Sequence, residues 1–450
     1  MLSRLKLSIL GLSVALAFAS TTARAEGPGV RLGDRLVLHP GLAAELRYDS
    51  NVFFLSSNEV GALIVRLLPS LDLATRPPQR GGNQPHGIDF RLHLGADYTE
   101  FVTGGPVTSA HRSIGAQIGM LLTLFPYHLF SADVYDNYVR TTQPPYNEQP
   151  YNLDRDTNEV GTRLRFRPGG GRLEIDASYT FGIDFFEPQA LNPAITDLNV
   201  YYHRVQLHGQ WAFFPKTAVY LDISETPYIY ANLANAQVLD HSNSYPLRID
   251  AGLVGLVTTK LSINVFVGYG NAFYQSNPNQ TKMVNGMVVS TTPSANTALG
   301  GVDLRWRPTI LSTGVVGYKH DFANSLLGDY YDVDQVYVAW TQVIWRFTGS
   351  ARLQYQNIRY NGVDPSLGIV PSSNPALMPG NLFTRTDNNV MLDLRVDYPF
   401  KDWLSASIGY TLQYNNSDAQ LSTAGAGNTQ VLVPLNYIKH EVYLRLSLLY

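Results

Sequence analysis

Lys439-His440-Glu441-Val442-Tyr443-Leu444-Arg445-Leu446-Ser447-Leu448-Leu449-Tyr450 ends the chain and decides the fold. Apolar side chains at the even positions from Val442 onward alternate with Glu441, Tyr443, Arg445 and Ser447. Successive side chains of a β-strand point to opposite faces, so one face of this strand is apolar and the other is polar. The pattern predicts a strand between hydrocarbon and water, and the alternative is an amphipathic edge strand of a soluble sandwich.

The final strand also ends on an aromatic residue. A closing strand of this kind resembles the recognition signal of bacterial outer-membrane barrels, which the barrel-assembly machinery reads. The resemblance implies that this machinery is a partner and that the following residues form the signal: Leu444, Leu446, Leu448 and Tyr450.

The first 25 residues predict export from the cytoplasm. Arg4 and Lys6 precede the apolar stretch 7–20, which is too short to span a bilayer, and Ala23-Arg24-Ala25 is a small-x-small cleavage site. No later stretch has the roughly 18 unbroken apolar residues of a membrane helix. We therefore expect a signal peptide at 1–25, a short periplasmic segment at 26–35 and a membrane barrel made of strands at 36–450.

Composition agrees with a barrel. The chain has no Cys, 28 Tyr, 37 Gly and 15% charged residues, whereas soluble domains average about 25% charged residues. Three of its 33 basic residues lie in the predicted signal, so the formal net charge goes from −3 to −6 in the mature chain. This balance does not indicate a nucleic-acid partner.

One alternating pattern recurs along the chain, as in Leu173–Phe185, where odd positions are apolar or aromatic and even positions are polar or Gly. It predicts an all-β fold, a transmembrane antiparallel β-barrel of about 18 strands with long extracellular loops and short periplasmic turns. The run 76–87 is an exception, a long turn on the short side. We expect strands near 36–48, 61–74, 88–101, 111–124, 128–140, 157–167, 172–185, 200–213, 217–230, 245–257, 261–274, 295–307, 311–322, 331–345, 348–360, 386–398, 403–415 and 435–450.

Aromatic residues at both ends of these strands predict two girdles at the membrane interfaces. Those near the short turns are Phe125, Tyr127, Phe213, Trp306, Trp345, Phe347, Tyr398 and Trp403. Those near the long loops are Tyr98, Phe185, Phe186, Tyr201, Tyr230, Tyr274, Tyr318, Tyr360 and Tyr414.

Alternation also predicts which charged residues line the lumen. Both signs occur on this face, which indicates a solvated interior; an Arg-rich wall with inward Tyr135, Tyr337 and Tyr443 would also suit sugars or anionic groups. The lumen-lining candidates are Arg91, Arg163, Arg165, Glu174, Asp176, Arg248, Asp250, Arg305, Arg307, Arg352, Asp393 and Arg395.

An enzymatic function is not expected. Asp240-His241-Ser242 has the residue types of a triad, but consecutive loop residues rarely orient toward one another. His320 and Asp321 are adjacent on a strand and point to opposite faces, and the spacing of the histidines, which include His203 and His208, shows no metal site. We expect no cofactor, and with only residues 26–35 before the first strand we expect no plug domain.

Arg47-Tyr48-Asp49-Ser50-Asn51-Val52-Phe53, where the first strand meets the first outer loop, resembles porin-type β-barrels that accompany exopolysaccharide gene clusters in Gram-negative bacteria. The resemblance implies an outer-membrane conduit for a secreted polysaccharide, with outer-membrane lipid and periplasmic polysaccharide-export proteins as partners. The alternative is a general or solute-specific diffusion porin. A third class, a structural or adhesion barrel, is consistent with the long polar loops.

Overall fold

The structure is a computed structural model of the whole chain. It describes residues 27–75, 87–142, 154–188, 193–239, 241–277, 281–284, 287–290, 294–365, 368–377, 381–424 and 430–450. The predicted signal peptide and nearly all of the exceptional turn 76–87 lie outside the described residues.

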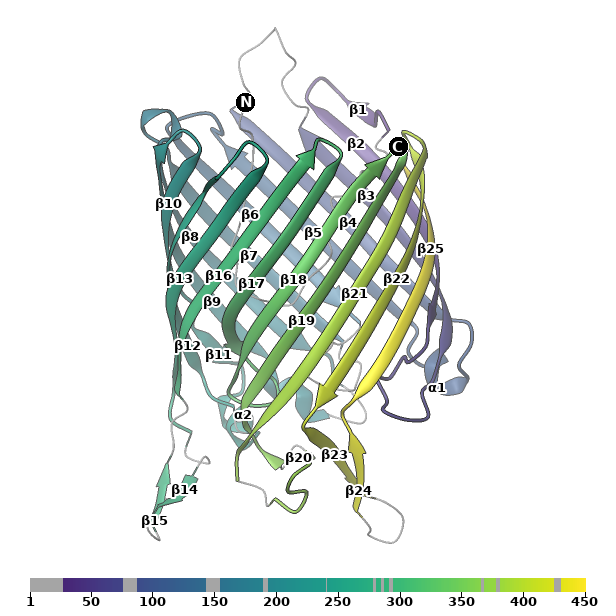
Figure 1. Cartoon of the computed structure of the whole chain (residues 1–450), viewed down its shortest axis with the longest axis vertical. Coiled ribbons are helices and arrows are strands. Elements are labelled where there is room, and N and C mark those ends of the chain that lie inside the picture. Colours follow the sequence, from purple (N-terminus) through teal and green to yellow (C-terminus); the bar gives the residue numbers. More distant parts are fainter. Residues whose placement is uncertain are drawn as a thin grey trace.

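Eighteen long antiparallel strands form one closed barrel (Figure 1). Alternating residues favour strands here because each strand meets lipid on one face and water on the other. The strands are β2 (Leu36–Asp49), β3 (Ala62–Thr75), β4 (Ile88–Phe101), β5 (Ser113–Leu124), β6 (Phe130–Thr141), β7 (Arg155–Phe166), β8 (Leu173–Phe186), β9 (Val200–Phe214), β10 (Thr217–Glu225) with its continuation β11 (Tyr228–Tyr230), β12 (Ser244–Leu256), β13 (Leu261–Tyr274), β16 (Ser294–Thr309), β17 (Ser312–Asn324), β18 (Tyr330–Ile344), β19 (Phe347–Val363), β21 (Phe383–Lys401), β22 (Leu404–Ser417) and β25 (Tyr437–Leu449).

The sheet closes where the last strand pairs with the first. The register runs from Gly41 opposite Leu449 to Asp49 opposite Glu441. A short strand, β1 (Val30–Leu32), pairs antiparallel with the first three residues of β2. Closure removes the free edges that an open sheet would expose. The eighteen predicted strands are confirmed, and their ends differ from the prediction by at most three residues.

The two ends of the barrel differ. Gly27, where the described chain begins, lies with the C-terminus and the short turns at one end, which we take as periplasmic. The longer loops lie at the other, extracellular end (Figure 1). The connection 169–171 at the periplasmic end forms the 3-10 turn η1 (Gly169–Gly171).

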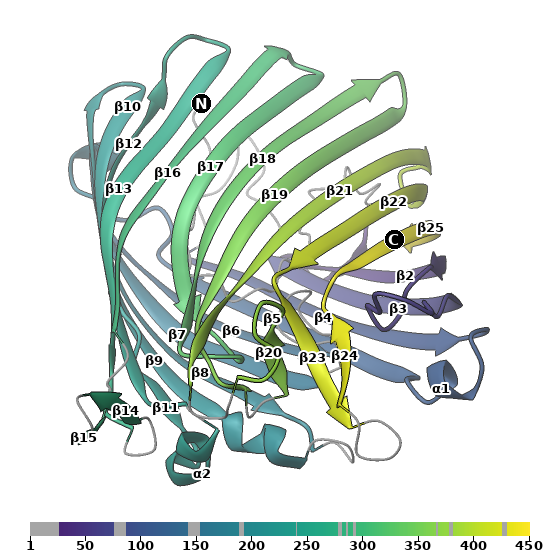
Figure 2. The ribbon, with the colours of Figure 1, turned by 60° about the horizontal axis from the view of Figure 1, so that its bottom comes forward.

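The extracellular loops contain regular structure that the sequence analysis did not predict. They hold α1 (Pro106–Ser109), η2 (Pro193–Leu198), α2 (Leu233–Val238), a hairpin of β14 (Thr281–Val284) and β15 (Met287–Ser290), and a three-stranded sheet of β20 (Ile369–Pro371), β23 (Ala419–Ala424) and β24 (Gln430–Pro434). Figure 2 brings this end forward and shows the sheet at the mouth of the barrel. Among the described residues, none of the helices has the length and apolar character needed to cross a membrane.

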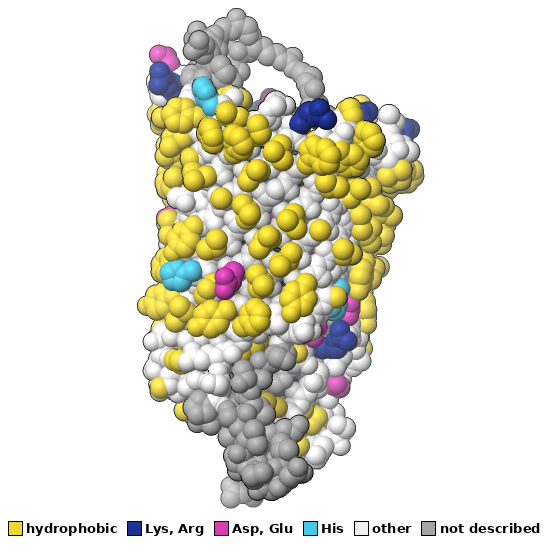
Figure 3. Space-filling view, turned by 90° about the vertical axis from the view of Figure 1, so that its left-hand side faces the viewer, with side chains coloured by type: hydrophobic (Ala, Val, Ile, Leu, Met, Phe, Trp, Pro, Cys, Tyr) yellow, Lys and Arg dark blue, Asp and Glu magenta, His cyan; other side chains and the backbone are white. Residues whose placement is uncertain are grey.

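The outer wall of the barrel is apolar. Large hydrophobic side chains such as Val205, Ile408 and Leu444 point outward with more than half of their surface exposed, and Figure 3 shows hydrophobic side chains spread over one side of the barrel. An aqueous location would expose this whole surface to water, far beyond the patches that soluble proteins tolerate. A closed barrel instead pairs its backbone internally and can face hydrocarbon.

The aromatic girdles are confirmed at the periplasmic end, where Phe125, Trp306 and Trp345 are exposed. At the extracellular end the prediction is wrong for four rings, because alternation turns them into the lumen: Phe186, Tyr230, Tyr274 and Tyr360. Tyr360 is only 1% exposed. These rings belong to the packing of the lumen and not to the lipid interface.

Candidate functional site: the barrel lumen

The twelve lumen candidates lie on the strand faces opposite the exposed apolar residues. They are distributed around the wall: Arg91 in β4, Arg163 and Arg165 in β7, Glu174 and Asp176 in β8, Arg248 and Asp250 in β12, Arg305 and Arg307 in β16, Arg352 in β19, and Asp393 and Arg395 in β21. They therefore share the inner face of the barrel but do not form one cluster.

Arg165 brings three of these candidates together. Its guanidinium lies 3.3 Å from the carboxylates of both Glu174 and Asp176 on β8, and 3.1 Å from Asp133 on β6. One cation thus links three neighbouring strands laterally. The Arg165 side chain is only 10% exposed, so these pairs are shielded from bulk water, and removing one partner would leave an uncompensated charge on the wall.

Other candidates have separate partners. Arg352 donates to Gln354 at 2.9 Å and lies 4.8 Å from the centre of the Tyr337 ring. Asp393 accepts a hydrogen bond from Thr411 at 2.9 Å, and Arg395 pairs with Asp397 at 2.7 Å. Within the described residues, Arg163, Arg305 and Arg307 have no ion pair. The lumen therefore presents both paired and unpaired positive charge.

The densest charge cluster lies on the closing seam, and the candidate set missed it. Glu45 of β2 has a fully buried side chain and accepts from Arg47 at 2.9 Å, Arg66 at 3.2 Å and Arg445 at 2.5 Å. Arg66 also pairs with Asp97 of β4. Alternation places Glu45, Arg47 and Arg445 on the inward face, but the register that joins β2 to β25 was needed to bring them together.

A second group extends this seam toward the extracellular end. Lys439 of β25 lies 2.7 Å from Asp49 and 3.3 Å from Glu441, and Glu441 accepts from Arg47 at 2.9 Å. Each cation therefore bridges the first and last strands of the chain. The seam is the place where the barrel has no covalent turn, so these contacts hold strands that the chain itself does not connect.

The element at residues 47–53 lies at the outer end of the same seam. The Asn51 side chain is fully buried, donates to the carbonyl oxygens of Leu55 at 2.8 Å and Ile438 at 3.1 Å, and accepts from the Leu55 N–H at 2.9 Å. Ser50 and His440 exchange two hydrogen bonds, each 2.9 Å long. The element thus fastens the first extracellular loop to the last strand, which gives it a structural role in barrel closure.

The residues considered for catalysis lie apart. His320 pairs with Asp334 at 2.8 Å on the outer wall, while Asp321 pairs with Arg248 in the lumen, so the two adjacent residues face opposite sides. His203 contacts Tyr179 on the outer face at 2.8 Å.

The lumen histidine and the loop tripeptide are also separate. His208 pairs with Asp222 in the lumen at 2.7 Å. In the loop tripeptide, Asp240 lies outside the described residues, and His241 and Ser242 are buried without forming a hydrogen bond to each other. In the part of the chain that the structure describes, no three His, Cys, Asp or Glu side chains gather as a metal site would require.

One short connection folds into the lumen. β17 pairs with β16 only as far as His320 opposite Gly300. Beyond this point Asn324 donates to the Ser244 hydroxyl of β12 at 2.8 Å, and the Tyr274 hydroxyl of β13 donates to the Asp329 carbonyl oxygen at 2.9 Å. The chain therefore crosses the inside of β16 and β13 before it returns to β18.

We call residues 325–329 of this connection the inner bridge, because two successive leucines join two hydrophobic clusters. Leu326 packs against a cluster of Phe186 at the end of β8 and Ile195 and Leu198 of the β8–β9 connection. Leu327, which is 1% exposed, belongs to a second cluster on the other side. No signal in the sequence indicates that this short connection turns inward.

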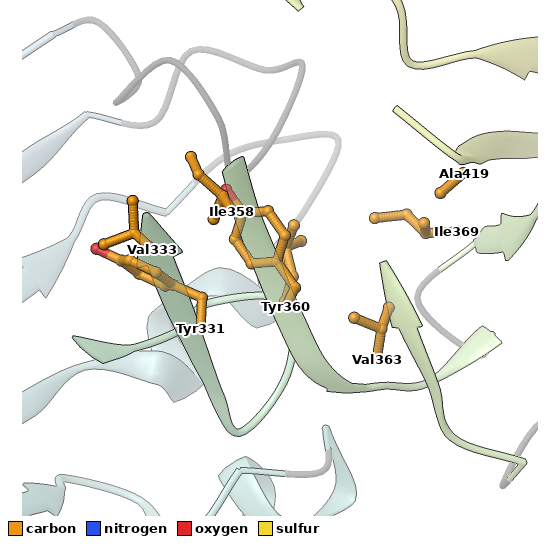
Figure 4. Close-up of a cluster of buried hydrophobic side chains, with 8 residues drawn as sticks. Tyr331, Val333, Ile358, Tyr360, Val363, Ile369 and Ala419 are labelled. Atoms are coloured by element: carbon orange, nitrogen blue, oxygen red, sulfur yellow. The ribbon is translucent and has the colours of Figure 1, made fainter. Parts of the chain in front are cut away.

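The second cluster joins the inner wall to the sheet at the mouth. Figure 4 shows Tyr331 and Tyr360 on two neighbouring strands, with Ile369 and Ala419 approaching from the extracellular sheet. Gly328 has no room for a side chain, because an added Cβ would lie 2.4 Å from the Asn361 carbonyl oxygen. The inner bridge is therefore fixed by a hydrophobic cluster at each leucine and by the close approach of Gly328 to the Asn361 main chain.

A loop histidine lies under the same packing. His241 is 3% exposed, hydrogen-bonds the main chain of Leu326, and has its ring 5.8 Å from that of Tyr230. Burial lowers the pKa of His241 to about 4, because the charged imidazolium is poorly solvated there. The neutral imidazole is thus the form that this buried position favours.

The closed eighteen-strand barrel, its apolar exterior and its charged lumen define a transmembrane β-barrel of the kind found in bacterial outer membranes. This is the class of the protein that the fold and the lumen establish.

Comparisons add similar structures but no family. No protein-family model matches the chain, and no curated protein matches it. The chain is similar to Acinetobacter baumannii OccAB4, with 10% identity and a TM-score of 0.45 over 92% of this chain and 98% of that one. It is also similar to Pseudomonas aeruginosa OccK2 (OpdF) in complex with glucuronate (9% identity, TM-score 0.43, 92% and 98% covered) and to the FrpB iron transporter from Neisseria meningitidis (9%, 0.45, 93% and 82%).

Proposed function

We propose that the protein is a passive diffusion channel for small hydrophilic solutes. The observation that carries this proposal is the inner bridge, which crosses the inner wall at the extracellular end of a polar lumen. A small solute needs only a narrow aqueous path beside this segment. A polymer chain needs a wide and continuous one.

The charges of the lumen support a hydrated path. Cations and carboxylates alternate around the wall, as in the Arg165 group and at Arg395 and Asp397. Charged groups at a water-filled wall keep it wet, and a polar interior is the usual lining of a porin. No catalytic role is part of this proposal. The partners that it requires are outer-membrane lipid and the barrel-assembly machinery, which would read Leu444, Leu446, Leu448 and Tyr450 on the exposed face of β25.

Export of a secreted polysaccharide is the second candidate, with periplasmic polysaccharide-export proteins as its partners. The width of an eighteen-strand barrel favours it, because barrels of 16 to 18 strands enclose an aqueous channel. The resemblance at residues 47–53 favours it less, since those residues bind the first loop to the last strand and do not face a cargo.

Liposome swelling tests the proposal directly. Vesicles that contain the refolded protein should swell in monosaccharides at a rate that falls steeply for oligosaccharides of increasing length. Val238→Ala, a change at an exposed position of α2, serves as a matched control and should swell like the wild type. Vesicles that contain folded protein yet swell no faster than empty ones would contradict the proposal.

A clean gene deletion separates the two candidates. The diffusion proposal expects slower entry of a small solute and unchanged secreted glycans. Loss of one secreted polysaccharide with unchanged solute entry would replace it with the export function.

A further inference from the structure

A recess in the inner wall lies beside the inner bridge. It has a volume of about 70 Å³ and is bounded by residues of β9, β10, β12, β13, β16 and β17. Since about 10–15 Å³ on this measure is enough for one water, the recess has room for several waters or for part of a small solute. A solute in the lumen could therefore insert part of itself into the wall.

The charges that line the recess balance. The basic residues are Arg204, Arg248 and Lys319, and the acidic residues are Asp222, Asp250 and Asp321. Every one of these cations already has an acidic partner: Arg204 lies 3.2 Å from Glu159, and both Arg248 and Lys319 pair with Asp321. An anionic solute would thus find no uncompensated cation, and a cationic one would meet three basic side chains.

Asp250 is the exception among the acids. Asp250 is only 7% exposed. Within the described residues its carboxylate forms no ion pair, and its Oδ1 accepts no hydrogen bond. A buried carboxylate oxygen without a donor is costly, since it has lost its water and gained no partner. Oδ1 is enclosed against Gly268 of β13, so a solute hydroxyl would donate to the other carboxylate oxygen, Oδ2, and would partly offset this cost.

Aromatic side chains complete the recess. Tyr228, Phe266 and Phe322 contribute apolar ring surface next to these polar groups. Phe322 is held in place by Arg248, whose guanidinium lies 4.6 Å from the ring centre. A few fixed polar groups beside apolar rings are typical of small-molecule sites. This combination matches a sugar or polyol, whose hydroxyls both donate and accept while its C–H surface is apolar.

We propose that this recess is a binding subsite for an uncharged polyhydroxylated solute, with Asp250 accepting a hydroxyl hydrogen bond and the aromatic rings contacting the C–H face. The inference rests on the proposed function, because it names the solute class that the channel selects. The selective contact then lies in the part of the wall between β9 and β17, and the lumen candidates on the other strands do not take part in it.

Current block of single channels in planar bilayers tests the subsite with D-glucose as the probe. The wild type should show saturable block by glucose, and Asp250→Asn should raise the half-saturating concentration about tenfold, the loss expected for one hydrogen bond to a charged group. Asp89→Asn changes an aspartate of β4 that does not line the recess, and should stay within about twofold of the wild type. Phe266→Leu provides a second variant that weakens ring contact while keeping the site apolar.

The outcomes distinguish this inference from the function on which it rests. Saturable block by acetate or glycine in place of glucose would overturn the proposed solute class, and equal effects of the two aspartate variants would overturn the location. Ion conductance with glucose block that never saturates would overturn the subsite and leave the diffusion channel standing. Folded protein with neither conductance nor swelling would overturn both.

Discussion

Releasing the inner bridge should open the channel, and Leu327→Ala is the change that tests this. Leu327 is 1% exposed and packs with Tyr331, Tyr360 and Val363. Replacing a fully buried leucine with alanine costs about 2–5 kcal/mol. If that cost falls on the docked bridge, the ratio of released to docked bridge rises by a factor of about 30 at the lower end of the range and several thousand at the upper end.

Single-channel recording should show this shift as frequent or sustained openings of higher conductance than the wild type. Val238→Ala, at a position 70% exposed in the same set of loops, should record like the wild type. Heat-modifiable migration on gels verifies that each variant is a folded barrel, and Leu327→Val is a milder substitute if the alanine variant does not fold. A folded Leu327→Ala barrel with a lower melting temperature but wild-type conductance would refute the reasoning, because the bridge would then not restrict the pore.

Three further results are expected. Asn51→Ala should lower the heat-modification midpoint without changing conductance, since it strands buried main-chain groups at a cost of about 1–3 kcal/mol; an unchanged midpoint would exclude the seam role. Leu446→Arg should reduce folding yield, at about 2–4 kcal/mol if the site is at the bilayer midplane, while Ser447→Arg on the lumen face should fold normally; equal yields would invert the inside and outside assignment. Conductance should rise as the pH falls from 6.5 toward 4. Burial lowers the pKa of His241 to about 4, so the ring takes up a proton more readily when its loop is released from the packing. The stability of the packed loop relative to the released loop therefore falls by up to about 3 kcal/mol over this pH range. His241→Gln should flatten this response, and a wild-type response of the same size in that variant would rule the histidine out.

The strands could be predicted because two solvents act on each of them at once. In β8, for example, the odd positions from Leu173 to Tyr179 face outward and the even positions Glu174 and Asp176 face the lumen. Hydrophobicity therefore alternates along the sequence with the period of a strand. The same signal was available for the misplaced rings. Phe186 and Tyr360 were assigned by their distance along the strand, whereas the alternation of their own strands already placed them inward.

The inner bridge could not be predicted in the same way. Ser325-Leu326-Leu327-Gly328-Asp329 is too short to show a period, and two adjacent leucines in a turn do not indicate which side they face. Leu326 packs on the end of β8 and the β8–β9 connection, and the cluster of Leu327 includes Ile369 of β20 and Ala419 of β23 as well as the nearby β18 and β19. Most of these partners are distant in the sequence. Only closure of the barrel brings these loops to one mouth, so the contact depends on tertiary structure.

Barrel closure also explains some sequence features that look functional. Tyr135 and Tyr443 face the lumen, but each lies on a glycine of the neighbouring strand: a Cβ added at Gly161 or Gly409 would lie 2.5 Å or 2.3 Å from the tyrosine ring. Such ring-on-glycine contacts fix the pairing of adjacent strands. Their rings are therefore partly committed to the wall and less available to a solute than their inward direction implies.

Barrel closure also accounts for the element at residues 47–53, so its resemblance to exopolysaccharide-associated barrels does not identify a cargo. Asp49, Ser50 and Asn51 each contact β25, the strand that has no covalent turn to β2. Any large barrel whose first loop must be fixed to its last strand has a reason to keep such polar groups there, whatever passes through its lumen. The element is therefore informative about how the barrel closes, and the solute must be inferred from the lumen itself, where the inner bridge and the recess at Asp250 provide the contacts that a passing molecule would meet.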